Sequence, residues 1–338
     1  MTKPSVLDVA RSAGVGASTV SRVLNNHPHI SESAKARVLA AVEELGYTPN
    51  LSARSLRSGQ TGAISVLLPM TGTAFYETLL SAVQAGLEAH DYDLALFPLL
   101  GERRFRRFRE SGALLYHADA LLIVSQSPDQ LYAGRPPFNK PVVLLDAHHP
   151  HHHSISFDNP AAGRMAAELA LSCGLPMVLL DVAEGPGDWP SPAFLERRGG
   201  VLETLSRRGV TPIQTLHAHT SPNYGREAAQ QLIASGIRPP FFLLALSDDL
   251  ALGASRQLLE AGWQAGRDYL LLGFDGSLEA AQAGMSSVAQ PVSQMGGAAA
   301  ETLLAALGGG LSTLTQRVFA PSLQERASTA ASLILGSR

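Results

Sequence analysis

After residue 62 the sequence alternates between short apolar runs and longer amphipathic stretches, and no other feature constrains the fold as strongly. Strand-like runs lie at positions 63–68, 94–97, 120–124, 142–146, 177–181, 241–245 and 269–274. Helical patterns lie between most of these runs, at 74–90, 160–172, 194–208, 224–234 and 249–261. Continuous apolar strands that alternate with helices are typical of a parallel sheet covered on both faces. Because residues 62–338 exceed one such sheet, we predict an α/β body of two doubly wound lobes.

The first 60 residues follow a different pattern, which predicts three short helices joined by turns. Gly14 is placed to end the first helix, and a second helical pattern covers 17–24. Ser31 is placed to cap a third helix, which Gly46 ends. A helix, a glycine-containing turn and a short second helix form the helix-turn-helix arrangement, whose second helix enters the major groove of DNA. The alternative is an ordinary three-helix unit whose polar residues are solvated surface.

Charge is divided unevenly along the chain. The net charge is −3, with 26 Lys and Arg against 29 Asp and Glu. Residues 1–60 carry seven basic and four acidic side chains, so this segment is positive while the remainder is negative. Such a split is expected when one small module contacts a polyanion and the rest of the chain has another role.

Composition and the N-terminal residues exclude several classes of protein. The single cysteine, Cys173, rules out an intramolecular disulfide and favours a reducing compartment. The apolar runs are strand-sized, well short of the ~18 residues that span a bilayer. The N-terminal sequence MTKPSVLDVARSAG lacks the apolar core of a signal peptide. We therefore expect a cytoplasmic protein with no membrane partner.

Four short motifs in the first 60 residues carry a family resemblance. They are DVARSAGV at 8–15, STVSRVLN at 18–25, LGYTPN at 45–50 and ARSL at 53–56. In this order and spacing they resemble the head of the LacI/GalR family of bacterial transcriptional repressors. The resemblance implies an all-α helix-turn-helix DNA-binding head at 1–49 and a hinge helix with its linker at 50–61. It also implies a two-lobed, periplasmic-binding-protein-like effector-binding and dimerisation domain at 62–338.

The resemblance also implies which residues contact DNA. Ala17, Ser18 and Arg22 would face base edges, where an arginine can bind the O6 and N7 atoms of guanine. A second group would lie near phosphates: Thr19, Ser21, Asn25, His29 and Ser31. In the hinge, which contains Ala53, Leu56 would wedge into the minor groove and bend the DNA. The alternative for Leu56 is packing against the protein core.

Polar and aromatic residues gather where predicted strands end. They are Phe75, Tyr76, Asp146, Ser247, Asp248 and Asp275. Ligands of parallel sheets bind beyond the carboxyl ends of the strands, and carboxylates with aromatic rings suit a sugar or similar polyhydroxylated ligand. The alternative for each aspartate is a helix cap, most directly for Asp248. The family resemblance adds Arg197 as an effector contact and places Ser247 where the family usually has Asn.

Two further clusters stand outside these motifs. One contains His148, His149, His151, His152 and His153; we expect a solvated loop, with a metal site or pH sensor as the alternative. The other contains Arg103, Arg104, Arg106, Arg107 and Arg109 around two phenylalanines; we expect a surface helix, with a second nucleic-acid contact as the alternative.

These observations together predict a sequence-specific DNA-binding transcriptional regulator, a repressor controlled by a small sugar-like effector. We expect a homodimer on palindromic operator DNA. A solute-binding protein of the same body fold is the alternative, although it would lack the head and carry a leader. An α/β enzyme is a third class, but the chain has no phosphate-binding glycine loop of the right form and no Gly-x-Ser-x-Gly elbow. We therefore expect no catalytic residues, no cofactor and no metal.

Overall fold

The computed structural model describes residues 4–24, 27–47, 60–69, 71–99, 103, 106–108, 118–132, 139–182 and 191–330. Its contacts divide the chain into two compact units, Met1–Thr61 and Gly62–Arg338, and each unit is described by itself. The DNA contacts expected of Asn25, Ala53 and Leu56 lie outside the described residues.

Three helices form the N-terminal unit, which we call the head: α1 (Val6–Ala13), α2 (Ala17–Leu24) and α3 (Glu32–Leu45). Helix α1 begins with a capping box, in which the Asp8 carboxylate accepts a hydrogen bond from the Ser5 backbone N–H at 2.9 Å. Val9, Val20 and Val38, one from each helix, are fully buried in a common core. The helix-turn-helix arrangement predicted from the sequence is confirmed.

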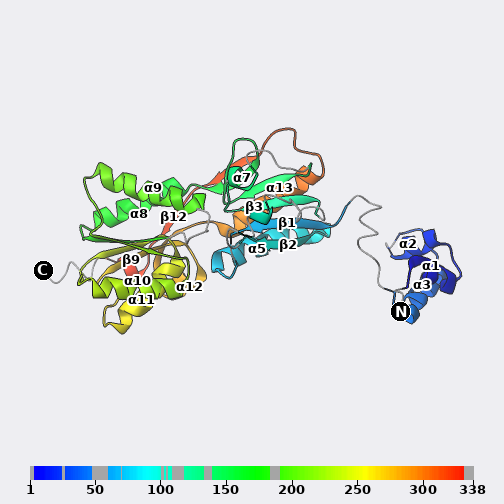
Figure 1. Cartoon of the computed structure of the whole chain (residues 1–338), viewed down its shortest axis with the longest axis horizontal. Coiled ribbons are helices and arrows are strands. Elements are labelled where there is room, and N and C mark those ends of the chain that lie inside the picture. The colour runs from blue at the N-terminus through cyan, green and yellow to red at the C-terminus, as the bar shows by residue number, and fades with distance from the viewer. Residues whose placement is uncertain are drawn as a thin grey trace. The chain divides into compact units, whose positions relative to one another are not determined.

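The second unit, which we call the body, is built from alternating strands and helices (Figure 1). Its described strands are β1 (Ala63–Leu68), β2 (Asp93–Pro98), β3 (Ala120–Val124), β4 (Val142–Leu145), β5 (His153–Phe157), β6 (Met177–Val182), β7 (Gln214–Ala218), β8 (Phe242–Ala245), β9 (Leu270–Asp275), β10 (Ser286–Ala289), β11 (Gln316–Phe319) and β12 (Ser322–Gln324). Its described α-helices are α5 (Ala74–Leu87), α7 (Pro128–Tyr132), α8 (Asn159–Ser172), α9 (Pro192–Arg207), α10 (Pro222–Ala234), α11 (Asp248–Glu260), α12 (Leu278–Gln282) and α13 (Val292–Leu307).

The described strands of the body form two six-stranded sheets, one in each lobe. The order is β11-β5-β4-β3-β1-β2 in the N-terminal lobe and β12-β10-β9-β8-β6-β7 in the C-terminal lobe. Neighbouring strands are parallel except for β12, which pairs antiparallel with β10. The predicted α/β body of two doubly wound lobes is confirmed.

Both faces of the C-terminal sheet are covered by helices, which explains why its strands are continuously apolar. Leu179 and Leu244 pack in one core cluster with residues of α8 and α9. Their chain neighbours Val178 and Leu243 pack in a second cluster with residues of α10 and α11. Figure 1 shows these two helix pairs on opposite sides of the sheet. Successive strand residues point to opposite faces, so a sheet covered on both sides needs an apolar residue at every position.

The chain crosses between the two lobes three times. It passes from β5 to α8 at Asp158, from β10 to α13 at Gln290 and Pro291, and from β11 to β12 at Ala320 and Pro321. Each lobe is therefore assembled from separate stretches of sequence, and the three crossings form the connection about which the lobes can turn.

Two glycines bring α8 and α9 into close contact. A Cβ atom at Gly163 of α8 would overlap the Arg197 carbonyl oxygen of α9, and one at Gly200 of α9 would overlap the Pro160 carbonyl oxygen of α8. Gly225 and Gly253 make the same reciprocal contact between α10 and α11. Only glycine permits such backbone approach, so these residues fix the positions of the helices that carry the site described below.

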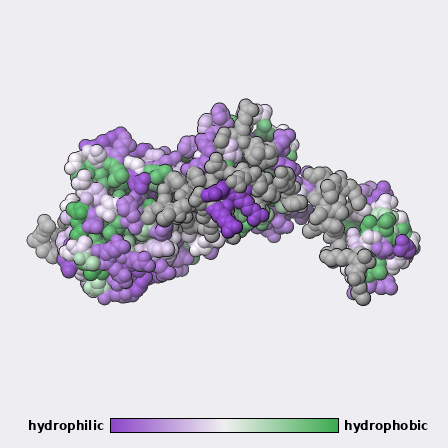
Figure 2. Space-filling view, in the orientation of Figure 1, coloured by the Kyte–Doolittle hydropathy of each residue, from purple (hydrophilic) through white to green (hydrophobic). Residues whose placement is uncertain are grey.

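The face of the molecule in Figure 2 alternates between hydrophilic and hydrophobic patches over the body. Among the described residues, no helix combines the length and the apolar character needed to cross a membrane.

Candidate functional site

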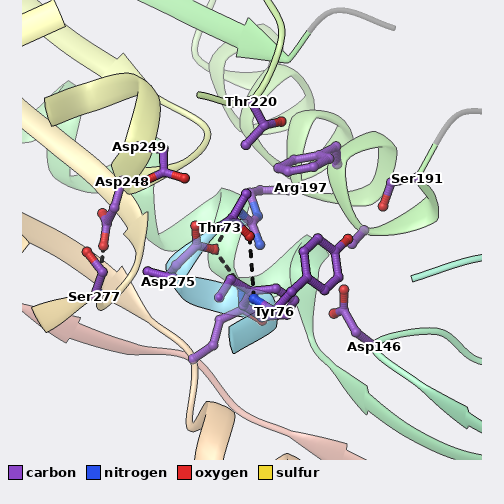
Figure 3. Close-up of a pocket in the computed structure, with 15 residues that line it drawn as sticks. Thr73, Tyr76, Asp146, Ser191, Arg197, Thr220, Asp248, Asp249, Asp275 and Ser277 are labelled. Atoms are coloured by element: carbon purple, nitrogen blue, oxygen red, sulfur yellow. Dashed lines mark hydrogen bonds and ion pairs between the residues drawn. The ribbon is translucent and has the colours of Figure 1, made fainter. Parts of the chain in front are cut away.

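A cavity lies between the two lobes and opens to solvent. Its wall contains aromatic, carboxylate and hydroxyl side chains from both lobes (Figure 3). The lining residues are Thr73, Ala74, Phe75, Tyr76, Asp146, Ser191, Ala193, Phe194, Arg197, Thr220, Asp248, Asp249, Asp275, Ser277 and Gln290.

The structure brings six of the seven predicted effector residues to this cavity. Phe75 and Tyr76 begin α5, Asp146 follows β4, and the others are Arg197, Asp248 and Asp275. Ser247 does not line the cavity: it is buried, and its hydroxyl accepts a hydrogen bond from the Leu250 backbone N–H at the start of α11. Ser247, and not Asp248, is thus the helix cap.

Asp248 is instead held by groups from two neighbouring segments. One carboxylate oxygen accepts a hydrogen bond from the Ser277 backbone N–H and the other accepts one from the Ser287 hydroxyl, both at 2.8 Å. The alternative, in which Asp248 caps its own helix, is therefore excluded, and its place on the cavity wall agrees with the predicted effector contact. Its side chain joins α11 to the segment that follows β9.

Arg197 is the centre of the polar network in the cavity. Its side chain is 2% exposed, and its guanidinium donates to the Asn159 side-chain oxygen at 3.1 Å and to the Leu246 carbonyl at 2.6 Å. It also lies 3.3 Å from an Asp275 carboxylate oxygen and stacks over the Phe274 ring. The planar guanidinium is thereby fixed by several partners at once, as a rigid binding group must be.

The backbone turns sharply where two of the aspartates leave their strands. Asp146 has φ 55° and Asp275 has φ 106°, in the region that favours glycine. Ser125, at the end of β3, has φ 51°, and its hydroxyl donates to Asp146 at 2.6 Å. Strained backbone of this kind is concentrated at functional sites, because there the direction of a side chain matters more than local energy.

Burial shifts the ionisation of the cavity aspartates. It raises the pKa of Asp146 to about 6, of Asp249 to about 6 and of Asp248 to about 7, and the nearby Asp275 carboxylate adds to each rise. Burial also raises the pKa of Asp275 itself, while Arg197 opposes that rise. Among the described lining residues, four aspartates thus face one arginine, and their carboxyl groups bind protons more readily than exposed ones do.

Three buried oxygen atoms on the cavity wall lack a hydrogen-bond partner within the described part of the chain. They are Oδ1 of Asp146, Oε1 of Gln290 and Oγ of Ser191. Unpaired buried acceptors are uncommon in folded proteins and are explained by a ligand or water that supplies the missing donors. A ligand rich in hydrogen-bond donors, seated against these residues, would supply partners for the two acceptors of Asp146 and Gln290.

In the head, α2 presents a polar face. Its Val20 and Val23 are buried, whereas Ser18 and Arg22 are exposed. The remaining described residues of the predicted DNA contact are half-buried (Ala17, Thr19 and Ser21) or exposed (His29 and Ser31). Ser31 also caps α3 as predicted, since its hydroxyl accepts a hydrogen bond from the Ala34 backbone N–H.

Comparison with known proteins identifies both units. The model of "Bacterial regulatory proteins, lacI family" matches residues 5–50, and that of "Periplasmic binding protein-like domain" matches residues 186–329. The ribose operon repressor of Escherichia coli is 29% identical, over 94% of each chain. A solved structure of a probable transcription regulator from Thermus thermophilus is 35% identical, covering 78% of this chain and 97% of that one, with a TM-score of 0.66. A lac repressor dimer, solved with operator and the anti-inducer ONPF, is 25% identical over 97% and 99% of the two chains, with a TM-score of 0.78.

The chain belongs to the lacI family of bacterial regulatory proteins. It is a DNA-binding transcriptional regulator, and the match to the head favours this over a solute-binding protein of the same body fold. The relatives described above are named as regulators and repressors rather than as enzymes.

Several cavity residues of this LacI-family regulator were not predicted from the sequence. They include Thr73, Phe194, Thr220, Asp249, Ser277 and Gln290. Asp249 had a usable signal, because it stands in the first turn of a helix that follows a predicted strand. Gln290 and Thr220 lie in loops whose direction depends on the packing of whole elements, so local sequence patterns carry little information about them.

The histidine cluster of this LacI-family regulator is more ordered than the predicted solvated loop. His152 is 6% exposed, its Nδ1 lies 2.9 Å from Nδ1 of His149, and its Nε2 lies 2.9 Å from the Tyr132 hydroxyl. His149 also lies 3.4 Å from the Asp129 carboxylate. Burial lowers the pKa of His152, which favours the neutral ring. The expectation of a solvated loop was wrong for His152, and the described residues contain no group of three ligands that could hold a metal.

The arginine cluster of the protein agrees with a surface segment where the structure describes it. Arg103, Arg106 and Arg107 are exposed, whereas Phe108 is 2% exposed and belongs to the core of the N-terminal lobe. The aromatic residue therefore anchors the segment and the arginines face outward, as the spacing predicts.

Proposed function

We propose that this regulator is a homodimeric repressor that binds a palindromic operator through α2 and responds to a sugar-like effector in the cavity between its lobes. One observation carries the effector role: residues from both lobes converge on a single cavity that contains unpaired buried acceptors. A ligand that contacts both lobes binds more tightly to the conformation with one angle between the lobes than to a conformation with another angle. It therefore shifts the equilibrium between the two conformations.

The chemistry of the cavity suits a polyhydroxylated ligand. Phe75 and Phe194 line the cavity and supply aromatic rings, which suit the apolar face of a sugar. Asp146 and Gln290 offer acceptors for hydroxyl groups, and Arg197 offers a rigid donor. The relative named as a ribose operon repressor supports control of sugar-related genes.

The exposed face of α2 supports operator recognition. Small side chains beside Arg22 allow a helix to approach base edges closely, and a guanidinium pairs with guanine. The lac repressor structure was solved as a dimer on operator, which supports a dimer for this chain. A two-fold dimer reads two half-sites of a palindrome.

The cavity network reaches two of the three crossings between the lobes. Arg197 donates to Asn159 at the first crossing, and Gln290 at the second crossing donates to Asp275 at 2.8 Å. A ligand that engages Arg197 or Gln290 therefore acts directly on the segments about which the lobes turn. Because β1 begins immediately after the predicted hinge at 50–61, a change in lobe angle would be transmitted to the paired heads of a dimer.

The test is operator affinity with and without sugars. Operator sequences are selected from random DNA by the purified protein, and their affinity is measured by fluorescence anisotropy across a panel of neutral sugars, amino sugars and sugar phosphates. We expect at least one sugar to change operator affinity by about tenfold, within the usual range of allosteric coupling. Unchanged affinity across the whole panel would contradict sugar control, and failure to select any sequence would contradict operator recognition.

A separate incubation tests our expectation that the protein does not convert the sugar that it binds. We expect the bound sugar to be recovered chemically unchanged after prolonged incubation with the protein, because the cavity has no nucleophile activated by a neighbouring base among its described residues. Depletion of the sugar with enzyme-like kinetics would contradict this expectation.

A further inference from the structure

The charge of the cavity narrows the class of effector. Four aspartates line it (Asp146, Asp248, Asp249 and Asp275), and Arg197 is the one basic side chain on the described wall. Arg197 is already paired with Asp275 and bonded to Asn159 and Leu246. Asp146, Asp248 and Asp249 therefore make no ion pair among the described residues, although Arg197 acts electrostatically on Asp146 and lowers its pKa. Hydroxyl groups of a ligand would need only neutral acceptors.

Two of these carboxylates have oxygen atoms that can still accept hydrogen bonds from a ligand. Asp248 uses both oxygens on Ser277 and Ser287, whereas Asp146 leaves Oδ1 unpaired. The Asp249 carboxylate makes no hydrogen bond or ion pair within the described part of the chain. In Figure 3 Asp249 and Asp146 enter the cavity from opposite sides, one from each lobe, with Arg197 between them. A ligand seated in the cavity would have the Asp249 carboxylate at one end and the unpaired Oδ1 of Asp146 at the other.

A separate observation indicates that the missing partner is a hydrogen-bond donor. Gln290 is 7% exposed and its Nε2 donates to Asp275, which leaves its Oε1 as an unpaired acceptor on the cavity wall. Together with Oδ1 of Asp146, the wall has two buried acceptors that await donors. Anionic ligands such as sugar phosphates and sugar acids supply acceptors and negative charge, so they oppose this arrangement on both counts.

We propose that the cavity selects an amino sugar, a polyhydroxylated ligand whose protonated amine is held by Asp249 or Asp146. An ammonium group supplies up to three donors and a positive charge, and buried carboxylates are stabilised when such a partner is present. Burial raises the pKa of Asp146 and of Asp249, and an ammonium group beside either carboxylate would oppose that rise. This inference rests on the proposed effector role of the cavity and adds the chemical class of the ligand.

The test compares matched sugars that differ at one group. Binding to the full-length protein is measured by calorimetry for glucosamine, galactosamine and mannosamine, each beside its parent sugar and its N-acetyl derivative. Glucose 6-phosphate and spermidine complete the panel. We expect at least one amino sugar to bind about tenfold or more tightly than both its parent and its N-acetyl form, the range expected for one charge-assisted hydrogen bond. Glucose 6-phosphate should not bind.

Two variants assign the amine contact. Asp249→Asn and Asp146→Asn keep the size of the side chain and remove its charge, and one of them should abolish the preference for the amine, measured as the ratio of amino-sugar affinity to parent-sugar affinity. Glu227→Gln is the matched control. Glu227 is exposed on α10, in the same lobe as Asp249, and does not line the cavity. This variant should leave the preference unchanged. Thermal unfolding checks that each variant is folded.

The outcomes separate this inference from the proposed function. Equal binding of amine, parent and N-acetyl forms in every set overturns the amine site but retains a sugar effector. Binding of spermidine in place of every sugar overturns both, because charge alone would then explain the acidic wall. If no compound with an amine binds, the amino-sugar inference is overturned. The proposal of a sugar effector then holds only if a neutral sugar still changes operator affinity.

Discussion

At the scale of single residues, the described wall of the cavity places several acidic side chains close together, and their repulsion makes it harder for each one to ionise. Asp249 illustrates this, because Asp275, Glu279 and Glu77 all raise its pKa, after burial. Its carboxyl group therefore binds a proton more readily in the folded protein than in the unfolded chain. By linkage, the free energy of unfolding that this group contributes is greatest below the unfolded pKa and is lost as pH rises through the folded pKa.

We predict that Asp249→Asn stabilises the ligand-free protein in a pH-dependent way. The variant should have a free energy of unfolding higher by on the order of 1 kcal/mol at about pH 8, where wild-type Asp249 is charged. The difference should shrink as pH falls through about 6 and vanish only below about pH 4, where Asp249 is protonated in the folded and the unfolded chain alike. Thermal unfolding across this pH range measures the difference. The exposed control Glu227→Gln should show no such trend, and a gain for Asp249→Asn that does not change with pH would contradict the assignment.

Arg22 is the residue of α2 that we expect to read a base. It is exposed on the polar face of the helix. Arg22→Ala should weaken binding to the selected operator by about 1–3 kcal/mol and relax the preference at one base position in each half-site. Repeating the selection with the variant protein shows the preference directly. If all sequences weaken equally, Arg22 contacts phosphate instead of a base.

Single residues also show how far sequence predicts a site. Asp146 and Asp275 were predictable because each follows a strongly apolar strand, and parallel strands bring their ends together. Ser247 satisfies the same rule, yet its hydroxyl turns back to cap α11. Gln290 had no local signal, since its place on the wall depends on how β10 leads into α13 across the lobes. Strand-end position was therefore predictable, while side-chain direction and lobe packing were not.

At the scale of elements, paired helices that share glycine contacts position the cavity wall. The α8–α9 pair holds Arg197, and the α10–α11 pair holds Asp248 and Asp249. In each pair, a glycine of one helix lies against the backbone of the other helix, and the reverse is also true; in the α8–α9 pair these residues are Gly163 and Gly200. Such contacts leave little freedom for the helices to slide, so each pair should move as one rigid body.

We predict that two adjacent glycines of α9 respond oppositely to the same substitution. Gly200→Ala places a methyl group against the Pro160 carbonyl and should lower the free energy of unfolding by about 2 kcal/mol or more. Gly199→Ala is the matched control: no atom lies within 4 Å of its added methyl, so better helix propensity should raise stability by up to about 1 kcal/mol. Denaturant unfolding measures both. Equal effects would show that the close approach of α8 and α9 is unimportant.

Several strands that the sequence failed to predict lack a continuous apolar run, for two different physical reasons. β7 lies at the edge of its sheet and its exposed side carries polar residues, so it lacks a continuous apolar run. β5 and β10 are buried but contain serines, which the fold hides through side-chain hydrogen bonds such as that between Ser286 and Thr329. Hydrophobic pattern alone therefore finds central apolar strands and misses edges and serine-rich strands.

At the scale of the whole molecule, the three crossings between lobes are the route by which a ligand can influence DNA binding. Because operator and effector act on one equilibrium, any factor by which effector weakens operator binding must equal the factor by which operator weakens effector binding. Measuring both affinities in the same buffer checks this equality. Unequal factors would show that the two ligands do not share a single equilibrium.

We predict that Gln290→Ala reduces the coupling more than it reduces binding. The change removes the contact between the second crossing and Asp275, so effector should still bind while its effect on operator affinity falls by about tenfold. Anisotropy titrations with and without effector measure that ratio. Gln282→Ala, at an exposed position in α12, should keep the full coupling. An unchanged ratio in Gln290→Ala would exclude this crossing as the route.

The same crossings have a consequence for how the chain is made. The N-terminal lobe needs α13 and β11, which are synthesised after most of the C-terminal lobe, and the C-terminal lobe needs β12. Until α13 emerges from the ribosome, the apolar surface of α5 that includes Leu79 and Val83 lacks its neighbouring helix. Neither lobe can be completed before the C-terminal part of the chain is synthesised, so the body should fold late, slowly and as a single unit. The exposed apolar surface that chaperones would cover should be greatest before synthesis reaches residue 307, where α13 ends.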